Sequence, residues 1–112
     1  MMTVRQVVER LELSVRAGGQ GADNEVRGGV VCDLLSVVMS KAAKGDLWIT
    51  VQCHPNVVAV AVLAGLSGIV ITHGFEPEPE TVAKAEEEGI PLLTTLASSF
   101  EVAGRFYALE AR

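Results

Sequence analysis

Aromatic residues and cysteines are both scarce in this sequence of 112 residues. It contains one Trp, one Tyr, three Phe and two Cys, yet hydrophobic residues make up 49% of the chain. The core must therefore be built from Val, Leu, Ala and Ile, and the length suits one domain covering residues 1–112. Two cysteines far apart in the sequence do not form a disulfide framework, which favours free thiols in a reducing, cytoplasmic protein.

The sequence also lacks an excess of basic charge and any long apolar run. Its net charge is -5, and the excess comes from residues 74–91, which hold six Glu and one Lys. Nucleic-acid-binding domains typically carry a basic patch, so this balance argues against nucleic acid as a partner. The longest apolar run, residues 57–66, has ten residues, whereas a membrane-spanning helix needs about 20. Because the N-terminus also lacks the apolar segment of a signal peptide, we expect no membrane partner.

Strand-like and helix-like segments alternate after residue 25. The strands are expected at residues 26–32, 47–53, 68–72 and 90–95. The helices that follow them are expected to end near Gly45, near Gly65, at Glu88 and near Glu110, with Asp33 capping the first. Such alternation predicts a parallel sheet with helices on both faces. The expected fold is a single three-layer α/β domain with a mostly parallel central sheet, flavodoxin-like in its βα rhythm.

The N-terminal quarter is expected to add a helix, a strand and a loop. Thr3 and Gln6 form a capping-box pattern before a helical stripe, as Ser98 and Glu101 do near the C-terminus. Residues 11–16 alternate apolar and polar, which is typical of a strand with one wet face. The Gly-rich segment 17–24 is not followed by a helix, so it is interpreted as a mobile connection rather than a phosphate-binding loop.

The stretch Cys53-His54-Pro55-Asn56 lies where a strand is expected to give way to a helix. Pro suits the first helical position, with His54 or Asn56 as the cap. Free N–H groups at positions 56–58 would then point past the carboxyl end of the sheet, where ligands bind in parallel α/β folds and where the helix dipole attracts anions. The candidate ligand-binding residues are His54, Asn56, Val57, Thr72, His73, Gly74, Thr94, Thr95 and Ser98.

The same end of the sheet allows other interpretations. Cys32, Asp33, Cys53, His54 and His73 could converge on zinc, but no CxxC or HxxxH spacing supports a metal site. Cys53 could be a thiol nucleophile with a histidine base, but neighbours in a strand point to opposite faces. The Thr and Ser hydroxyls could simply cap helices and turns. We therefore expect no metal, no cofactor and no catalytic residue.

A family resemblance depends on the residues that follow the second and third of these strands. Residues 26–110, with His54-Pro55 after one strand and Thr72-His73-Gly74 after the next, resemble a DRTGG domain. The family is named after an Asp-Arg and a Thr-Gly-Gly at these two places; the second is kept here in part and the first is not. Similar domains occur at the N-terminus of HPr kinase/phosphorylase, in some phosphotransacetylases and beside CBS domains in some pyrophosphatases.

The resemblance implies an α/β regulatory or interaction domain, often dimeric, without catalysis of its own. The kinase activity of HPr kinase belongs to a separate P-loop domain, and this sequence has no GxxxxGK[ST] motif. A kinase activity is therefore not implied. An adenine nucleotide is the ligand that the resemblance suggests first.

The sequence thus favours a non-catalytic regulatory module that binds a phosphate-bearing small molecule, or a partner protein, at the carboxyl edge of its sheet. A homodimer is expected because residues 34–44 carry more apolar side chains than one helix face needs. Two alternatives stay open. One is a purely structural homodimeric subunit of a larger complex, and the other is a small metal- or thiol-dependent enzyme.

Overall fold

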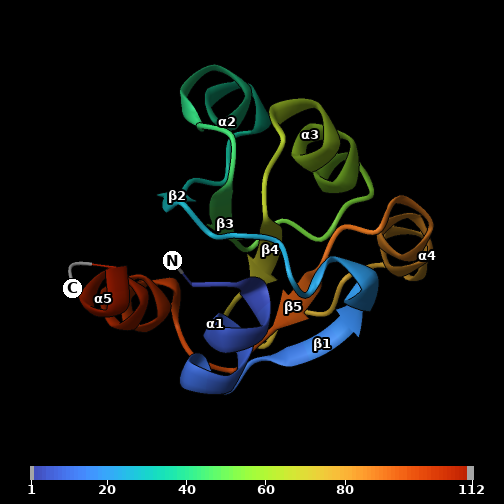
Figure 1. The fold of residues 1–112 in the computed structure, drawn as a ribbon. Helices are drawn as coiled ribbons and strands as arrows, with labels where there is room; N and C mark the ends of the chain where they lie inside the picture. The colour runs from blue at the N-terminus through green and yellow to red at the C-terminus, as the bar shows by residue number, and fades with distance from the viewer. Residues whose placement is uncertain (1, 111–112) are drawn as a thin grey trace.

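The computed structural model describes residues 2–110. The helices are α1 (Val4–Leu11), α2 (Leu35–Lys41), α3 (Asn56–Ala64), α4 (Pro79–Glu88) and α5 (Ser99–Glu110). The strands are β1 (Ser14–Ala17), β2 (Gly28–Val31), β3 (Asp46–Thr50), β4 (Gly68–Ile71) and β5 (Leu92–Thr94), and a short 3₁₀ helix, η1, covers Gly19–Gly21 (Figure 1).

The strands form one five-stranded sheet in the order β1-β5-β4-β3-β2. β2, β3, β4 and β5 are parallel to one another, and β1 is antiparallel to β5. α2, α3 and α4 cover one face of the sheet, and α1 and α5 cover the other (Figure 1). The predicted three-layer α/β fold with a mostly parallel sheet is confirmed. The strand order, however, is not the 2-1-3-4-5 order of flavodoxin.

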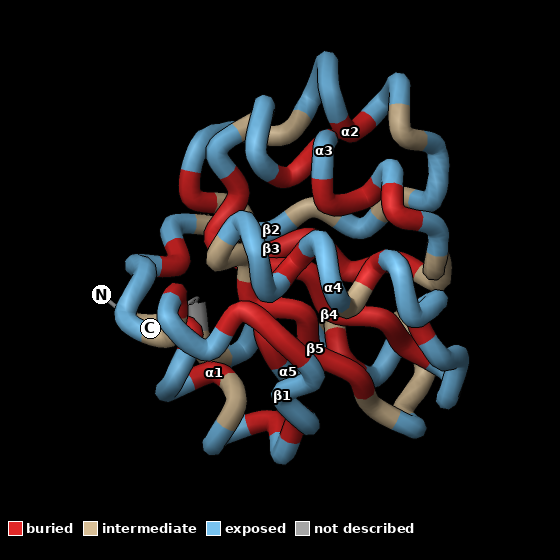
Figure 2. The backbone as a smooth tube through the Cα atoms, turned by 90° about the vertical axis from the view of Figure 1, so that its right-hand side faces the viewer, coloured by how far each residue is buried: buried red, intermediate tan, exposed pale blue. Residues whose placement is uncertain are grey.

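A separate hydrophobic core fills the space on each face of the sheet. Trp48 and Ile69 belong to the core beneath α2, α3 and α4, whereas Ile49 and Val70 belong to the core against α1 and α5. All four side chains are at most 1% exposed, and buried residues follow β3, β4 and β5 closely in Figure 2. Because both faces are covered, these strands show no polar alternation.

Several helix ends follow their sequence signals. Thr3 Oγ1 accepts a hydrogen bond from Gln6 N (3.3 Å), and Gln6 Oε1 accepts one from Thr3 N (2.9 Å). Ser98 and Glu101 exchange the corresponding bonds before α5. α4 spans residues 79–88 as predicted and ends at Gly89, whose φ is 69°. Both predicted capping boxes are therefore confirmed.

The first strand differs from the prediction of residues 11–16. α1 continues to Leu11 and ends at Glu12, which adopts the left-handed conformation (φ 55°). β1 begins only at Ser14, and Val15 is 53% exposed. β1 is an edge strand whose register shifts between Val15 and Ala17, so its burial does not alternate residue by residue.

The Gly-rich segment 17–24, predicted to be a mobile connection, is anchored at Ala17, Gly18 and Gly21, which are buried, whereas half of its residues are exposed. The Gly18 N–H donates to Glu86 Oε1 (2.9 Å). A Cβ atom at Gly18 would lie 1.9 Å from the Ile90 carbonyl oxygen, and the φ of Gly18 is +72°. Glycine is needed there for close approach of two backbone segments and for a left-handed turn.

α2 is shorter than predicted, and Asp33 does not cap it. Asp33 Oδ1 instead accepts hydrogen bonds from Thr50 Oγ1 (2.8 Å) and Val51 N (3.0 Å). The helix ends at Lys41, and Gly45 forms a separate turn with φ 89°. The carboxylate therefore joins the turn after β2 to the end of β3.

We expect Gly18→Ala to lower the free energy of unfolding by about 2 kcal/mol or more, because the left-handed conformation and a steric overlap both oppose a side chain there. Chemical denaturation followed by circular dichroism measures this loss. Gly19→Ala is the matched control, since a Cβ atom at Gly19 meets nothing within 4 Å. Equal stability of the two variants would contradict this role for Gly18.

Candidate functional site at the carboxyl edge of the sheet

The residues predicted to bind a ligand all lie at the carboxyl edge of the parallel strands. His54, Asn56 and Val57 follow β3 and begin α3. Thr72, His73 and Gly74 follow β4, whereas Thr94, Thr95 and Ser98 end or follow β5. The fold therefore brings these segments to one edge of the sheet, as expected from parallel strands.

The first N–H groups of α3 already have acceptors. The N-cap of α3 is Pro55, not His54 or Asn56 as predicted, but His54 Nδ1 accepts a hydrogen bond from Asn56 N (3.1 Å). Val57 N donates to the His54 carbonyl oxygen (3.1 Å), and Val58 N donates to the Pro55 carbonyl oxygen (3.0 Å). The prediction of free N–H groups at positions 56–58 is therefore wrong, because tight turn bonds use all three.

The turns after β4 and β5 are hydrogen-bonded to each other. His73 N donates to the Ala97 carbonyl oxygen (2.8 Å), and Gly74 N donates to the Thr95 carbonyl oxygen (2.9 Å). His73 Nε2 also accepts a hydrogen bond from Ser99 N at the start of α5 (3.1 Å). His73 and Gly74 both adopt positive φ values, 61° and 73°. These contacts bring the predicted residues together, but they also connect the two turns directly.

The predicted hydroxyl donors are buried or serve as local caps. Thr72 is fully buried, and its Oγ1 lies 2.6 Å from Ser99 Oγ. Thr94 is only 8% exposed. Thr95 Oγ1 and Ser98 Oγ each accept a hydrogen bond from a backbone N–H two or three residues later. The capping interpretation therefore accounts for Thr95 and Ser98.

Five of the predicted residues line two separate hollows. His54 and Asn56 line a groove of about 640 Å³ between α3 and α4. Gly74, Thr94 and Thr95 line a smaller hollow of about 220 Å³ beside β1. Val57 is fully buried and lines neither. No single cavity unites the predicted set.

The electrostatics of this edge are acidic. Arg16 lines the smaller hollow together with Gly74. Its guanidinium forms an ion pair with Glu76 (2.6 Å), which occupies the positive charge that an anion would need. Burial, and next the negative charges of Glu78 and Glu76, raise the pKa of the Cys53 thiol. Cys53 is therefore held as a neutral thiol, and an anionic ligand would meet the same negative charges.

Sequence reasoning missed the exposed apolar side chains at this edge. Leu34 after β2 is 65% exposed, Phe75 after β4 is 52% exposed and Leu96 after β5 is 89% exposed. Phe100, in the first turn of α5, is 88% exposed. One sequence signal could have identified them. Each is a large apolar residue in a turn or at the start of a helix, where no buried face of a helix or strand requires an apolar side chain.

Within residues 2–110, no group of three or more His, Cys, Asp or Glu side chains is arranged to hold a metal ion. Cys32 and Cys53 are both free thiols. None of the helices in the described part of the chain is long and apolar enough to cross a membrane.

Comparison with known proteins identifies a family and a related fold. The sequence profile of the DRTGG domain matches residues 6–109, which includes α1 and β1 and so extends further toward the N-terminus than the predicted 26–110. A solved structure of the CBS and DRTGG domains of the regulatory region of Clostridium perfringens pyrophosphatase, complexed with the activator diadenosine tetraphosphate, has a similar fold. A search of curated proteins finds no match.

The similarity to the pyrophosphatase structure has a TM-score of 0.69 at 16% sequence identity. It covers 91% of this chain but only 44% of the other, so this chain spans less than half of that protein's solved region. At this level of identity the comparison shows a shared fold. The profile match, by contrast, covers nearly all of the chain, and the chain belongs to the DRTGG domain family.

Proposed function

We propose that this chain is a non-catalytic regulatory domain that acts by binding protein, and that its first partner is a second copy of itself. The observation that supports this most directly is a group of exposed apolar side chains around the edge of β2. Val31 is 54% exposed, Phe100 88% and Tyr107 73%, and all three line one groove. Scattered exposed apolar residues are ordinary, but a contiguous group marks an interaction surface.

β2 itself is unprotected against pairing with another strand. It ends the sheet, because its only neighbour is β3. Its sequence, GGVV, contains neither the charge nor the proline that commonly blocks an edge strand. The adjoining groove, about 520 Å³ between β2 and α5, is lined mostly by glycine and apolar residues. An uncovered edge of this kind favours a protein partner.

A second copy of the chain fits this edge by symmetry. In a twofold dimer the same surface of each subunit meets the other, so β2 would pair with its own copy in antiparallel orientation. The sheet would then continue across the interface and satisfy the outer N–H and C=O groups of both strands. α2, which follows β2, carries further exposed apolar side chains at Val37 and Met39, and its N-cap residue Leu34 is also exposed.

We expect the wild-type chain to sediment as a dimer at concentrations of about 10–100 μM, the range that a weak dimer requires. Val31→Lys should be a folded monomer, because it places a charge at the edge of β2. Leu63→Lys is the control, since Leu63 is 75% exposed on α3, away from this edge, and should leave the dimer intact. A monomeric wild-type chain, or equal behaviour of the two variants, would contradict the proposed interface.

The non-catalytic part of the proposal predicts an unreactive Cys53. Its pKa is raised, so the folded chain favours the protonated thiol and pH must rise further before thiolate forms. In a Cys32→Ser background, alkylation of Cys53 by iodoacetamide at pH 8 should be slower in the folded chain than in urea. Ionisation of Cys53 should also lower stability as the pH rises through its raised pKa. Faster alkylation in the folded chain would favour the thiol-enzyme alternative.

Adenine-nucleotide binding at the carboxyl edge is the second candidate function. It is favoured by the pyrophosphatase regulatory region of similar fold, which was solved with diadenosine tetraphosphate. Binding would require some of the turn hydrogen bonds described above to open, which would weaken affinity. The residues proposed to form the nucleotide site are His54, Asn56, Val57, Thr72, His73, Gly74, Thr94, Thr95 and Ser98, of which Val57, Thr72 and Thr94 are buried and would contact the nucleotide only after the turns open.

The nucleotide proposal is tested by thermal unfolding with AMP, ADP, ATP, diadenosine tetraphosphate and inorganic phosphate. A ligand at about 100 times its Kd should raise the Tm by about 4 °C or more. Gly74→Glu should abolish the shift, whereas Gly74→Gln has the same backbone strain without the charge and should retain part of it. If no compound shifts the wild-type Tm, the purely structural homodimeric subunit becomes the better alternative.

A further inference from the structure

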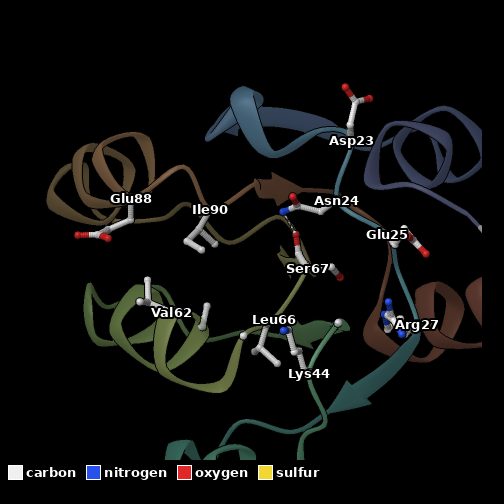
Figure 3. Close-up of a pocket in the computed structure, with 13 residues that line it drawn as sticks. Asp23, Asn24, Glu25, Arg27, Lys44, Val62, Leu66, Ser67, Glu88 and Ile90 are labelled. Carbon is white, nitrogen blue, oxygen red and sulfur yellow. Dashed lines mark hydrogen bonds between the residues drawn. The ribbon is translucent and has the colours of Figure 1, made fainter.

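A hollow of about 490 Å³ lies at the opposite, amino-terminal edge of the sheet. Its walls come from the segments that precede β2, β3 and β4, together with the end of α4. Figure 3 shows Ser67 among the lining residues, with Asn24 Nδ2 donating a hydrogen bond to the Ser67 carbonyl oxygen (3.2 Å). This volume falls in the range of small-molecule sites.

Ser67 has a buried hydroxyl without a partner. The residue is only 3% exposed, and among residues 2–110 its Oγ is the one buried side-chain oxygen or nitrogen that makes no hydrogen bond. The buried hydroxyls of Thr50, Thr72 and Thr81 do form hydrogen bonds; Thr81 Oγ1, for example, donates to the Cys53 carbonyl oxygen (2.6 Å). Leaving a buried hydroxyl unpaired is unfavourable, so a small shift that lets Ser67 Oγ donate to a molecule in the adjoining hollow would satisfy it.

The aliphatic stems of two exposed cationic side chains of the hollow, Arg27 and Lys44, lie over glycines. A Cβ atom at Gly45 would lie 2.7 Å from Arg27 Cδ, and one at Gly65 would lie 3.2 Å from Lys44 Cγ, so each stem lies over a glycine. Arg27 N donates to the Gly45 carbonyl oxygen (2.9 Å), and Gly45 N donates to the Gly65 carbonyl oxygen (2.8 Å). Neither charged head forms an ion pair within the described part of the chain.

The negative charges of the hollow come from Asp23, Glu25 and Glu88. Asp23 is paired with Arg5 (3.2 Å), whereas Glu25 and Glu88 form no ion pair among the described residues. Glu88 lies on the opposite side of the hollow from Arg27, and the apolar side chains of Val62 and Ile90 lie beside it (Figure 3). The hollow thus presents both signs of charge: Glu25 lies beside Arg27, whereas Glu88 lies apart, across the apolar surface (Figure 3).

We propose that this hollow binds a small zwitterion, with an anionic group at one end of a short apolar chain and an amino group at the other. Lys44 and Arg27 would bind the anionic group, and the Ser67 hydroxyl would donate to it. Glu88 would bind the amino group, and Val62, Leu66 and Ile90 would contact the chain. Because Glu88 lies across the apolar surface from the two cations, a zwitterion complements the hollow better than a simple anion does.

The test uses 6-aminohexanoate as the probe, with hexanoate and hexylamine as probes of matched length that carry one charge each. Binding to the full chain is measured by isothermal titration calorimetry. NMR chemical-shift changes of the backbone amides around Lys44 and around Ser67 then locate the bound probe. The zwitterion should bind at least about tenfold more tightly than either single-charge compound, which corresponds to one added charged hydrogen bond. Equal binding of hexanoate would overturn the zwitterion proposal, and so would no binding of any probe.

Variants separate a binding role from a structural one. Ser67→Ala removes the orphan hydroxyl, so the Tm of the free chain should stay equal or rise while the probe binds more weakly. Lys44→Met and Glu88→Gln should each weaken binding, whereas Lys41→Met on α2, outside the hollow, should not. A lower Tm for Ser67→Ala with unchanged affinity would overturn the assigned role of Ser67. Probe binding at this hollow does not depend on dimerisation, so the same measurements on Val31→Lys should give the same affinities.

Discussion

β2, β3, β4 and β5 lie side by side in the order in which they occur along the chain. Right-handed crossovers between such strands place every connecting helix on the same face of the sheet. α2, α3 and α4 accordingly share one face, and the other face must be covered by helices from outside the series. α1 and α5 provide that cover, so the second core joins the two ends of the chain.

The same strand order makes the edges of the sheet unequal. β1, which carries Arg16, forms one edge beside β5, while β2, whose sequence GGVV has no charged residue, forms the other. It also makes the connections from β4 and β5 diverge, because one leads to α4 and the other to α5 on the opposite face. Divergence of this kind is where a crevice opens in many α/β sheets. Here, hydrogen bonds between the two turns join them across that space.

Local signals predicted the elements well because they depend on neighbours in the sequence. Pro79 begins α4, and Gly89 follows its last residue. The capping side chains of Thr3 and Ser98 accept hydrogen bonds from backbone N–H groups three residues later. Signals that depend on distant neighbours were misread. Asp33 resembled a cap because nothing in the sequence indicated that Thr50 and Val51 would reach its carboxylate.

The candidate site was predicted in position but not in chemistry. The carboxyl edge follows from the strand rhythm, so the chosen residues do gather there. Whether an N–H group is free depends on the tightness of the first helical turn, which the residues at 54–58 do not reveal in advance. The unpaired hydroxyl of Ser67 was equally hidden, because it depends on how three separate segments pack around it.

The hydrogen bonds of the two histidines determine which ring nitrogen carries the proton. Each accepts a backbone N–H with one ring nitrogen, His54 with Nδ1 and His73 with Nε2. A nitrogen that accepts carries no proton, so the neutral rings must be opposite tautomers, with the proton of His54 on Nε2 and that of His73 on Nδ1. His54 therefore presents its N–H donor at Nε2, the ring nitrogen farther from Cβ. His73 presents its donor at Nδ1, the ring nitrogen nearer to Cβ.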